Sequence, residues 1–229
     1  MKKILFITGL MASVLCAKGN IAITMKSIGT VSVKRDTAAA VPLKTGKALV
    51  DQDLIQTGDN GFASLVYLDD RTIIKIRSNT ELKIGGTKQE NGLSKNLDIM
   101  HGKLKVNVSD QKGKEFKVST PTSVASVKGT EFFISSSQSG DSFTVLEGVV
   151  SVENTSTGQT VEVAQGQAVE SIPDAPMEVV AATEEVLAEA AEEAAEEEEA
   201  IEVEFGPNEI RIEFEDEDGN IKTTIIEYE

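Results

Sequence analysis

The residues of this chain that could carry out chemistry are few and scattered. Asp69 and Asp70 are adjacent, and paired carboxylates can act as general acid and base. Neighbouring residues of a strand point to opposite faces, so we interpret this pair as turn residues rather than as a catalytic pair. His101 is the only histidine, and its position before Gly102, between two apolar runs, indicates a surface turn. A Ser-His-Asp hydrolase would depend on His101 alone, and no His-cluster metal site can form.

Asp216, Asp218 and Asn220 have the spacing with which a calcium-binding loop begins. A hairpin turn explains the Asp-Gly-Asn sequence at 218–220 equally well, so these three residues are only weak calcium candidates. The chain contains no P-loop, H-E-x-x-H or G-x-S-x-G motif. We therefore expect no catalytic residue, no cofactor and no other metal site, and the sequence predicts a protein that is not an enzyme.

Residues 1–19 have the layout of a secretory signal peptide, with Lys2 and Lys3 before an apolar run that ends in small residues. That run is shorter than the ~20 residues of a membrane-spanning helix, so we expect no span in the mature chain and a periplasmic or extracellular location. Cys16 is the only cysteine and can form no intramolecular disulfide. Leu15 stands where a bacterial lipobox has a small residue, so we do not expect a lipid anchor at Cys16.

The net charge of −16 is concentrated at one end of the chain. Residues 18–177 hold equal numbers of acidic and basic side chains, whereas residues 178–229 have a net charge of −18. A protein that binds nucleic acid through its phosphates needs a basic surface, so this distribution argues against a nucleic-acid partner.

Between residues 20 and 172, apolar residues alternate with polar ones in short runs separated by turn-forming residues. The run 103–108 is the clearest, with Leu104, Val106 and Val108 on one side. More than ten such runs, spaced about ten residues apart, predict an all-β fold: a β-solenoid-like or barrel-like stack of short strands. Its core should contain Leu104, Val106, Phe116, Val118, Phe132, Ile134 and Val145.

Read in order, this region resembles the FecR domain. The resemblance depends on the order and spacing of common residues rather than on one decisive motif. Asp70 stands where the family usually has a turn glycine, and 51–53 reads Asp-Gln-Asp where the family prefers Gly-Asp, so these turns should be slightly strained. The motif positions, which we interpret as structural, are Thr57, Gly58, Gly61, Gly102, Thr120, Pro121, Gly129, Thr130, Phe132, Gly148 and Gly166.

The acidic tail has two predicted parts. Residues 173–200 read as a Pro-containing linker followed by an acidic Ala/Glu helix, which self-repulsion should hold away from the body as a solvated spacer. Residues 201–229 alternate again and predict a three-strand β-meander with one apolar face. That face needs a cover, which could be the body, a partner or a second copy, so self-association through the meander is one alternative.

The resemblance implies a function of the binding or signalling class. FecR domains occur in transmembrane regulators that control a sigma factor, but this sequence more closely resembles the stand-alone exported form. The first hypothesis is a binding or scaffolding module of the bacterial cell envelope, with an envelope protein or polymer as partner. The alternative is a soluble periplasmic component of FecR-type signal transduction that regulates a sigma-factor pathway through a membrane partner.

Overall fold

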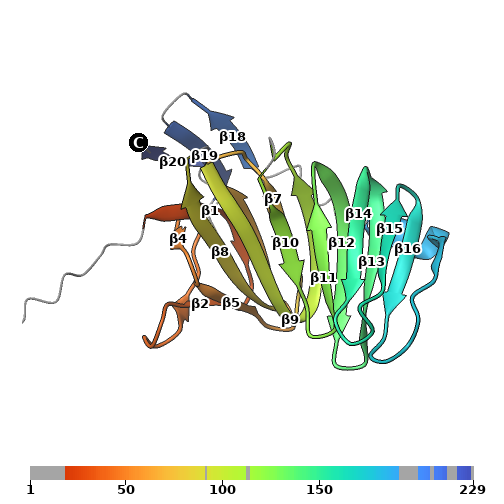
Figure 1. The fold of residues 1–229 in the computed structure, drawn as a ribbon. Coiled ribbons are helices and arrows are strands. Elements are labelled where there is room, and N and C mark those ends of the chain that lie inside the picture. Colours follow the sequence, from red (N-terminus) through yellow and green to blue (C-terminus); the bar gives the residue numbers. More distant parts are fainter. Residues whose placement is uncertain are drawn as a thin grey trace, which may run out of the picture.

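The computed structural model describes residues 19–90, 92–111, 114–190, 201–206, 209–215 and 221–227. Within these ranges the chain forms two facing sheets that share one long strand, followed by a short helix and a separate three-strand sheet (Figure 1). The fold is therefore all-β, as predicted. The two main sheets are open at both ends, which favours the stacked arrangement over a closed barrel.

The first sheet, sheet A, has antiparallel neighbours throughout. In spatial order its strands are β4 (Ala48–Val50), β1 (Asn20–Ile28), β6 (Phe62–Tyr67), β7 (Ile73–Ile76), the second half of β9 (Gly92–Val108), β12 (Thr130–Ser137), β13 (Gly140–Glu147), β16 (Gln167–Ser171) and β17 (Val179–Ala181).

The second sheet, sheet B, is antiparallel except between β9 and β10. Its strands in spatial order are β3 (Val41–Pro42), β2 (Val31–Lys34), β5 (Leu54–Thr57), β8 (Glu81–Gln89), the first half of β9, β10 (Phe116–Ser119), β11 (Ser123–Val127), β14 (Val149–Asn154) and β15 (Thr160–Ala164).

The strand β9 joins the two sheets because it bends at Gly102. This glycine has φ 109°, and a Cβ atom there would lie 2.3 Å from Thr80 Oγ1, so no larger residue fits without a shift. Thr80 Oγ1 also accepts a hydrogen bond from the Lys103 amide at 3.0 Å, which fixes the bend. The interpretation of His101 as a turn residue between two strands is therefore wrong, since His101 is an exposed residue within β9.

The hydrophobic core lies between the inner faces of sheets A and B. Period-two alternation places every second side chain there, and one continuous cluster includes residues from both sheets. The seven predicted core residues are all buried, with exposed fractions of 0–1%. This confirms the predicted register of the strands that contain them.

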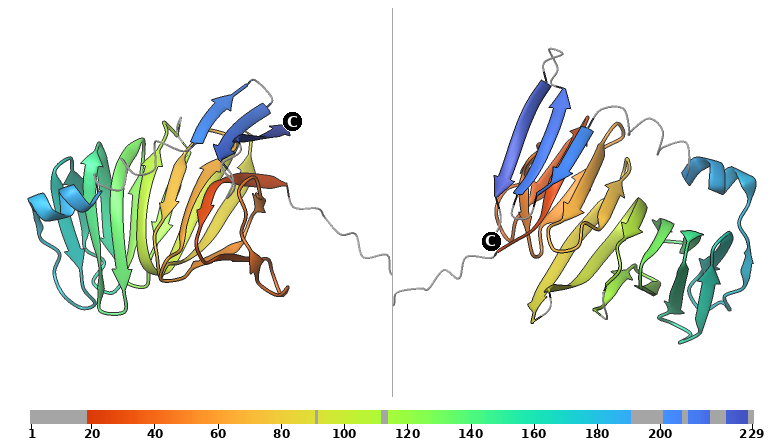
Figure 2. Two further views of the ribbon diagram at one scale, coloured as in Figure 1. Left: turned by 180° about the vertical axis from the view of Figure 1, so that it is seen from behind. Right: turned by 90° about the horizontal axis from the view of Figure 1, so that it is seen from above.

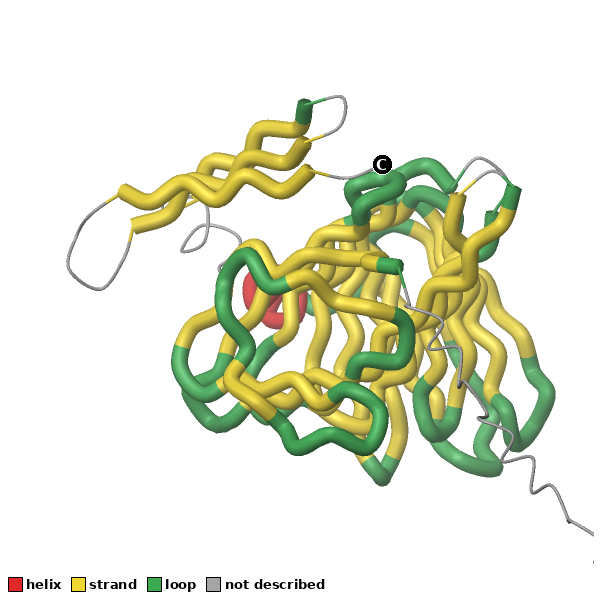
Figure 3. The backbone as a smooth tube through the Cα atoms, turned by 90° about the vertical axis from the view of Figure 1, so that its left-hand side faces the viewer, coloured by secondary structure: helices red, strands yellow, loops and turns green. Residues whose placement is uncertain are grey.

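The tail begins on sheet A instead of leaving the body. β17 pairs with β16, and residues 184–190 form a short helix after it (Figure 2). Glu189 of this helix pairs with Lys103 of β9. The prediction of a spacer held away from the body is therefore wrong for residues 179–190, because lysines on sheet A supply the opposite charge. Beyond the helix, β18 (Ile201–Phe205), β19 (Glu209–Glu215) and β20 (Ile221–Glu227) form the predicted meander, which is hydrogen-bonded as a separate sheet (Figure 3).

Candidate functional site: a buried ion cluster and an open groove

A buried lysine forms the centre of the most highly connected polar cluster. Lys95 lies on the core side of β9, and its side chain is 0% exposed. Its Nζ lies 2.9 Å from Asp69 Oδ2 and 2.7 Å from Asp70 Oδ2. Both aspartates belong to the turn between β6 and β7. Because they lie in a turn and not in a strand, adjacent carboxylates can reach the same ammonium group.

Neighbouring groups make further hydrogen bonds and contacts with the charged side chains of this cluster. Gln111 Nε2 donates to Asp70 Oδ2 at 2.6 Å, and the Thr72 amide donates to Asp70 Oδ1 at 3.0 Å. The Lys95 ammonium also lies 5.2 Å from the centre of the Tyr67 ring, a cation–π distance. The hydroxyl of Tyr67 donates to the Gly85 carbonyl at 2.8 Å.

The electrostatics of the cluster favour an ionised Asp70 and a neutral Tyr67. Burial raises the pKa of Asp70, but the hydrogen bond from Lys95, the Thr72 amide, the Lys95 charge and Gln111 together outweigh burial and lower it. Burial, followed by the charges of Asp69 and Asp70, raises the pKa of Tyr67 far above its ordinary value. The cluster therefore holds fixed charges and joins the β6–β7 turn to β9, which is a structural arrangement.

The turn that contains Asp70 has a strained backbone. Arg71, not Asp70, has a left-handed backbone, with φ 64°. The turn at 51–53, where the sequence also departs from the family pattern, is strained as well, because Gln52 has a left-handed backbone with φ 72°. Asp53 beside it is fully buried and is held by Arg35 through two hydrogen bonds of 2.8 and 2.7 Å.

The family-motif residues lie at strand ends and in the loops that follow them. Thr57 Oγ1 donates to the Arg77 carbonyl at 2.5 Å, and Thr120 Oγ1 accepts from the Ser123 amide at 2.8 Å. Thr130 Oγ1 donates to the Val149 carbonyl at 3.0 Å, and Phe132 is fully buried. Gly102 lies within β9, and the remaining motif residues occupy turns or loops at strand ends: Gly58, Gly61, Pro121, Gly129, Gly148 and Gly166.

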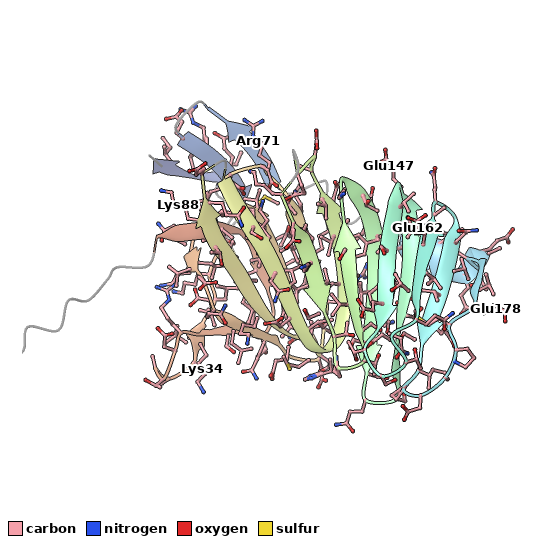
Figure 4. All side chains as sticks on the ribbon, viewed as in Figure 1. Lys34, Arg71, Lys88, Glu147, Glu162 and Glu178 are labelled. Atoms are coloured by element: carbon pink, nitrogen blue, oxygen red, sulfur yellow. The ribbon has the colours of Figure 1, made fainter. Side chains whose placement is uncertain are left out.

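An open groove of about 750 Å³ crosses the outer face of sheet B over β10, β11, β14 and β15. One register row forms its floor, with Lys117 opposite Ser126, Ser126 opposite Ser151, and Ser151 opposite Glu162. Glu162 is labelled on this sheet in Figure 4. The side chains of this row are short serines between a lysine and a glutamate, so the floor of the groove is polar.

One wall of the groove is basic and partly apolar. Lys117 of the floor row and Lys128 make this side basic, and Lys117 Nζ lies 3.0 Å from the exposed Glu115 carboxylate, whereas Lys114 Nζ lies 3.6 Å from Asp69. Val149 also lines the groove and is 49% exposed, which is high for a large apolar side chain. The neighbouring Gly148 has φ 85° and leaves the surface low beside Val149. This combination can hold a protein segment with both polar and apolar side chains.

Sequence reasoning missed both Lys95 and this groove. The signal for Lys95 was its position in the alternating run Leu93, Lys95, Leu97 and Ile99, where the other three residues are apolar. The groove has no motif, because it arises when residues of four strands come into register. The calcium candidates Asp216, Asp218 and Asn220, and likewise Cys16, lie outside the described residues.

His, Cys, Asp and Glu side chains form no group of three or more that could hold a metal ion in the part of the chain that the structure describes. In those same ranges, no helix has the length and hydropathy needed to cross a membrane.

The fold and these surfaces define a two-sheet β stack with a buried ion cluster and an exposed groove. Residues 53–151 match the family model described as FecR protein, so the chain contains a FecR domain. The match runs from Asp53 to Ser151 and covers Lys95, both aspartates and most of the groove. It supports a role in signal transduction. No curated protein matches the chain.

Two crystal structures of a proposed anti-sigma factor from Parabacteroides distasonis have a similar fold. One has 17% sequence identity and a TM-score of 0.48, and the other has 16% identity and a TM-score of 0.46. Each comparison covers 56% of this chain and 59% of the solved chain, so this protein matches somewhat more than half of their length.

Proposed function

We propose that this protein is a non-enzymatic binding module that holds a protein partner of the bacterial cell envelope in the groove over β10, β11, β14 and β15. The observation that carries the proposal is the groove itself, in which Val149 is half-exposed between lysines and short polar side chains. Protein interfaces typically combine an apolar centre with a polar rim. The buried ion cluster supports the non-enzymatic part of the proposal, because its charged groups are enclosed and are already paired with one another and with neighbouring donors.

The second candidate is a component of FecR-type signal transduction that regulates a sigma-factor pathway through a membrane partner. The match of residues 53–151 to the FecR family favours it. The two candidates share the same groove and differ in the partner. An envelope protein or polymer without regulatory function fits the first, and a membrane-bound regulator fits the second.

A capture experiment with matched variants tests the groove. Lys117 and Lys83 are both on the outer face of sheet B, and both form ion pairs, with side chains 42% and 35% exposed. Lys117→Glu should abolish capture of the partner from envelope extracts, and Lys83→Glu should retain it. Equal capture by the wild type and both variants would contradict the groove as the binding site.

The identity of the captured protein separates the two candidates. Recovery of a membrane-bound regulator, together with a changed sigma-factor reporter in cells that express Lys117→Glu, would support signal transduction. Recovery of an envelope protein or polymer with an unchanged reporter would support the binding or scaffolding role.

A further inference from the structure

The last strand of the meander, β20, exposes apolar side chains at the edge of its sheet. Among the described residues β20 pairs with β19 alone, so the other side of its backbone is open (Figure 2). Ile221 is 76% exposed and Ile225 is 52% exposed, and Thr223 between them is also exposed. Residues two apart in a strand point to the same face, so these three side chains form one row.

The neighbouring strand gives this row no apolar contact. In the register of β19 and β20, each of the two isoleucines lies opposite a charged residue, Glu215 or Arg211. Thr223 Oγ1 donates a hydrogen bond to Glu213 Oε1 at 3.3 Å, so the polar member of the row has its partner within the sheet. The isoleucines can therefore gain an apolar neighbour only on the open side of β20.

The strand edges at the start of the body are protected against pairing with another chain. β3 contains Pro42, which has no amide hydrogen to donate. At β4, the Val50 amide donates to Asp53 Oδ2 at 2.9 Å, and the Ala48 carbonyl accepts from Arg35 Nη2 at 3.3 Å. Proline and inward-turned charged side chains are devices that keep edge strands from associating.

The remaining edges are short or acidic, and β20 is neither. β17 has three residues, and at the end of β15 the Ala164 amide donates to Gln167 Oε1 at 2.9 Å. The sequence of β18 includes Glu202 and Glu204, so two copies paired there would bring glutamates together. β20 has seven residues and no proline, which leaves it as the least protected edge of the described chain.

The spacing of the β20 row is self-complementary. If two copies pair in antiparallel fashion about a two-fold axis at Thr223, Ile221 of each copy lies opposite Ile225 of the other. Cross-strand pairs of β-branched residues stabilise a sheet, and the two-fold axis produces this pair twice. A second copy of the same strand thus supplies the apolar neighbours that β19 does not.

We propose that two copies of this protein pair through β20, so that their meanders form one continuous antiparallel sheet. One short strand covers less area than a standard interface of ~1,600 Å², so the dimer should be weak and its population should depend on concentration. Residues 201–229 contain ten acidic and two basic residues, so the two meanders repel each other. Added salt should therefore strengthen the association, because it screens this repulsion. The inference is independent of the groove on sheet B.

Sedimentation velocity of the full-length protein over a concentration series tests the proposal. The wild type should shift from monomer to dimer as its concentration rises. Ile225→Glu should weaken dimerisation by about tenfold or more, because it places a carboxylate opposite Ile221 in both pairs. Val180→Glu is the matched control: Val180 is also 52% exposed and lies on the edge strand β17, so this variant should dimerise like the wild type. Far-UV circular dichroism of both variants should match the wild type.

Cysteine crosslinking tests the register, in chains whose only native thiol is removed by Cys16→Ser. Thr223→Cys should form a disulfide with its own copy on mild oxidation, since opposite residues of antiparallel strands have Cα atoms ~4.5–5.5 Å apart, within disulfide range. Ile221→Cys and Ile225→Cys should crosslink only when the two variants are mixed, because two copies of either position would lie ~14 Å apart.

Three results would overturn the proposal. The first is a wild type that stays monomeric throughout the concentration series. The second is equal dimerisation of Ile225→Glu and Val180→Glu. The third is crosslinking of the mixed isoleucine variants that does not exceed the crosslinking of each variant alone.

Discussion

Replacing Lys95 by methionine removes a charge that pairs directly with both Asp69 and Asp70 while filling most of the same volume. The lysine side chain is 0% exposed and the side chains of the two aspartates are 15% and 10% exposed, so water can replace the lost partner only in part. Removing one member of a buried ion pair costs ~3–5 kcal/mol, because the remaining charge stays buried without a partner.

The structure places the expected cost near the lower end of that range. Asp69 keeps Lys114 at 3.6 Å and the Leu93 amide at 3.1 Å, and Asp70 keeps Gln111 and the Thr72 amide. We therefore expect Lys95→Met to lower the free energy of unfolding by about 3 kcal/mol at pH 7. Adding Asp69→Asn and Asp70→Asn to this variant removes the buried charges and should recover at least half of that loss.

The pH dependence follows from the direction of the pKa shift. In the wild type, the folded-state pKa of Asp70 is below its unfolded value. Its stabilising contribution is therefore present above the unfolded pKa of about 3.9 and is lost as the pH falls through the lower folded pKa. In Lys95→Met, burial dominates and raises the folded-state pKa of Asp70. Protonation of Asp70 then removes its buried negative charge, which stabilises the folded variant. The stability difference between the two proteins should narrow from pH 7 to pH 4.

Urea unfolding followed by far-UV circular dichroism at both pH values measures these differences. The chain contains no tryptophan, so circular dichroism is a more suitable signal than fluorescence. A loss below about 1 kcal/mol at pH 7, the value of an exposed ion pair, would refute the buried cluster. A difference that widens on acidification would refute the assigned charge states.

Three further predictions concern the fold. Phe132→Ala should lower the free energy of unfolding by ~3–5 kcal/mol through lost burial and a cavity; a thermal melt within a degree or two of the wild type would place Phe132 on the surface. Gln52→Gly should be about 1 kcal/mol more stable than Gln52→Ala in urea unfolding, because only glycine relieves the left-handed backbone, and equal stabilities would contradict that strain. Gly102→Ala should destabilise by about 2 kcal/mol or more, since Thr80 must move, and an unchanged urea midpoint would contradict the bend in β9.

Alternation in the sequence was sufficient to predict the strands and the core. It worked because most strands have one face in the core, so residues such as Leu104 and Phe132 repeat with period two. It was less successful for β9, because Gly102 interrupts the pattern without ending the strand. Whether a glycine bends a strand or ends it depends on the close approach of Thr80, which is distant in sequence.

The surfaces could not be predicted in the same way. The body appeared neutral because its acidic and basic residues are equal in number, yet pairing of β1, β6, β7 and β9 brings its lysines together on one face. The same pairing explains why the tail contacts the body, against the expectation from net charge. The groove likewise depends on the register of β10, β11, β14 and β15, which no local pattern encodes.

The central claim is that the groove on sheet B holds the protein partner, and site-specific photo-crosslinking in cells tests it most directly. A photo-reactive residue at Ser126, in the groove floor, should give a discrete crosslinked adduct with one partner. The same residue at Gln56, exposed on the same face of sheet B but outside the groove, should give none. No adduct from Ser126, or the same adduct from both positions, would contradict the account.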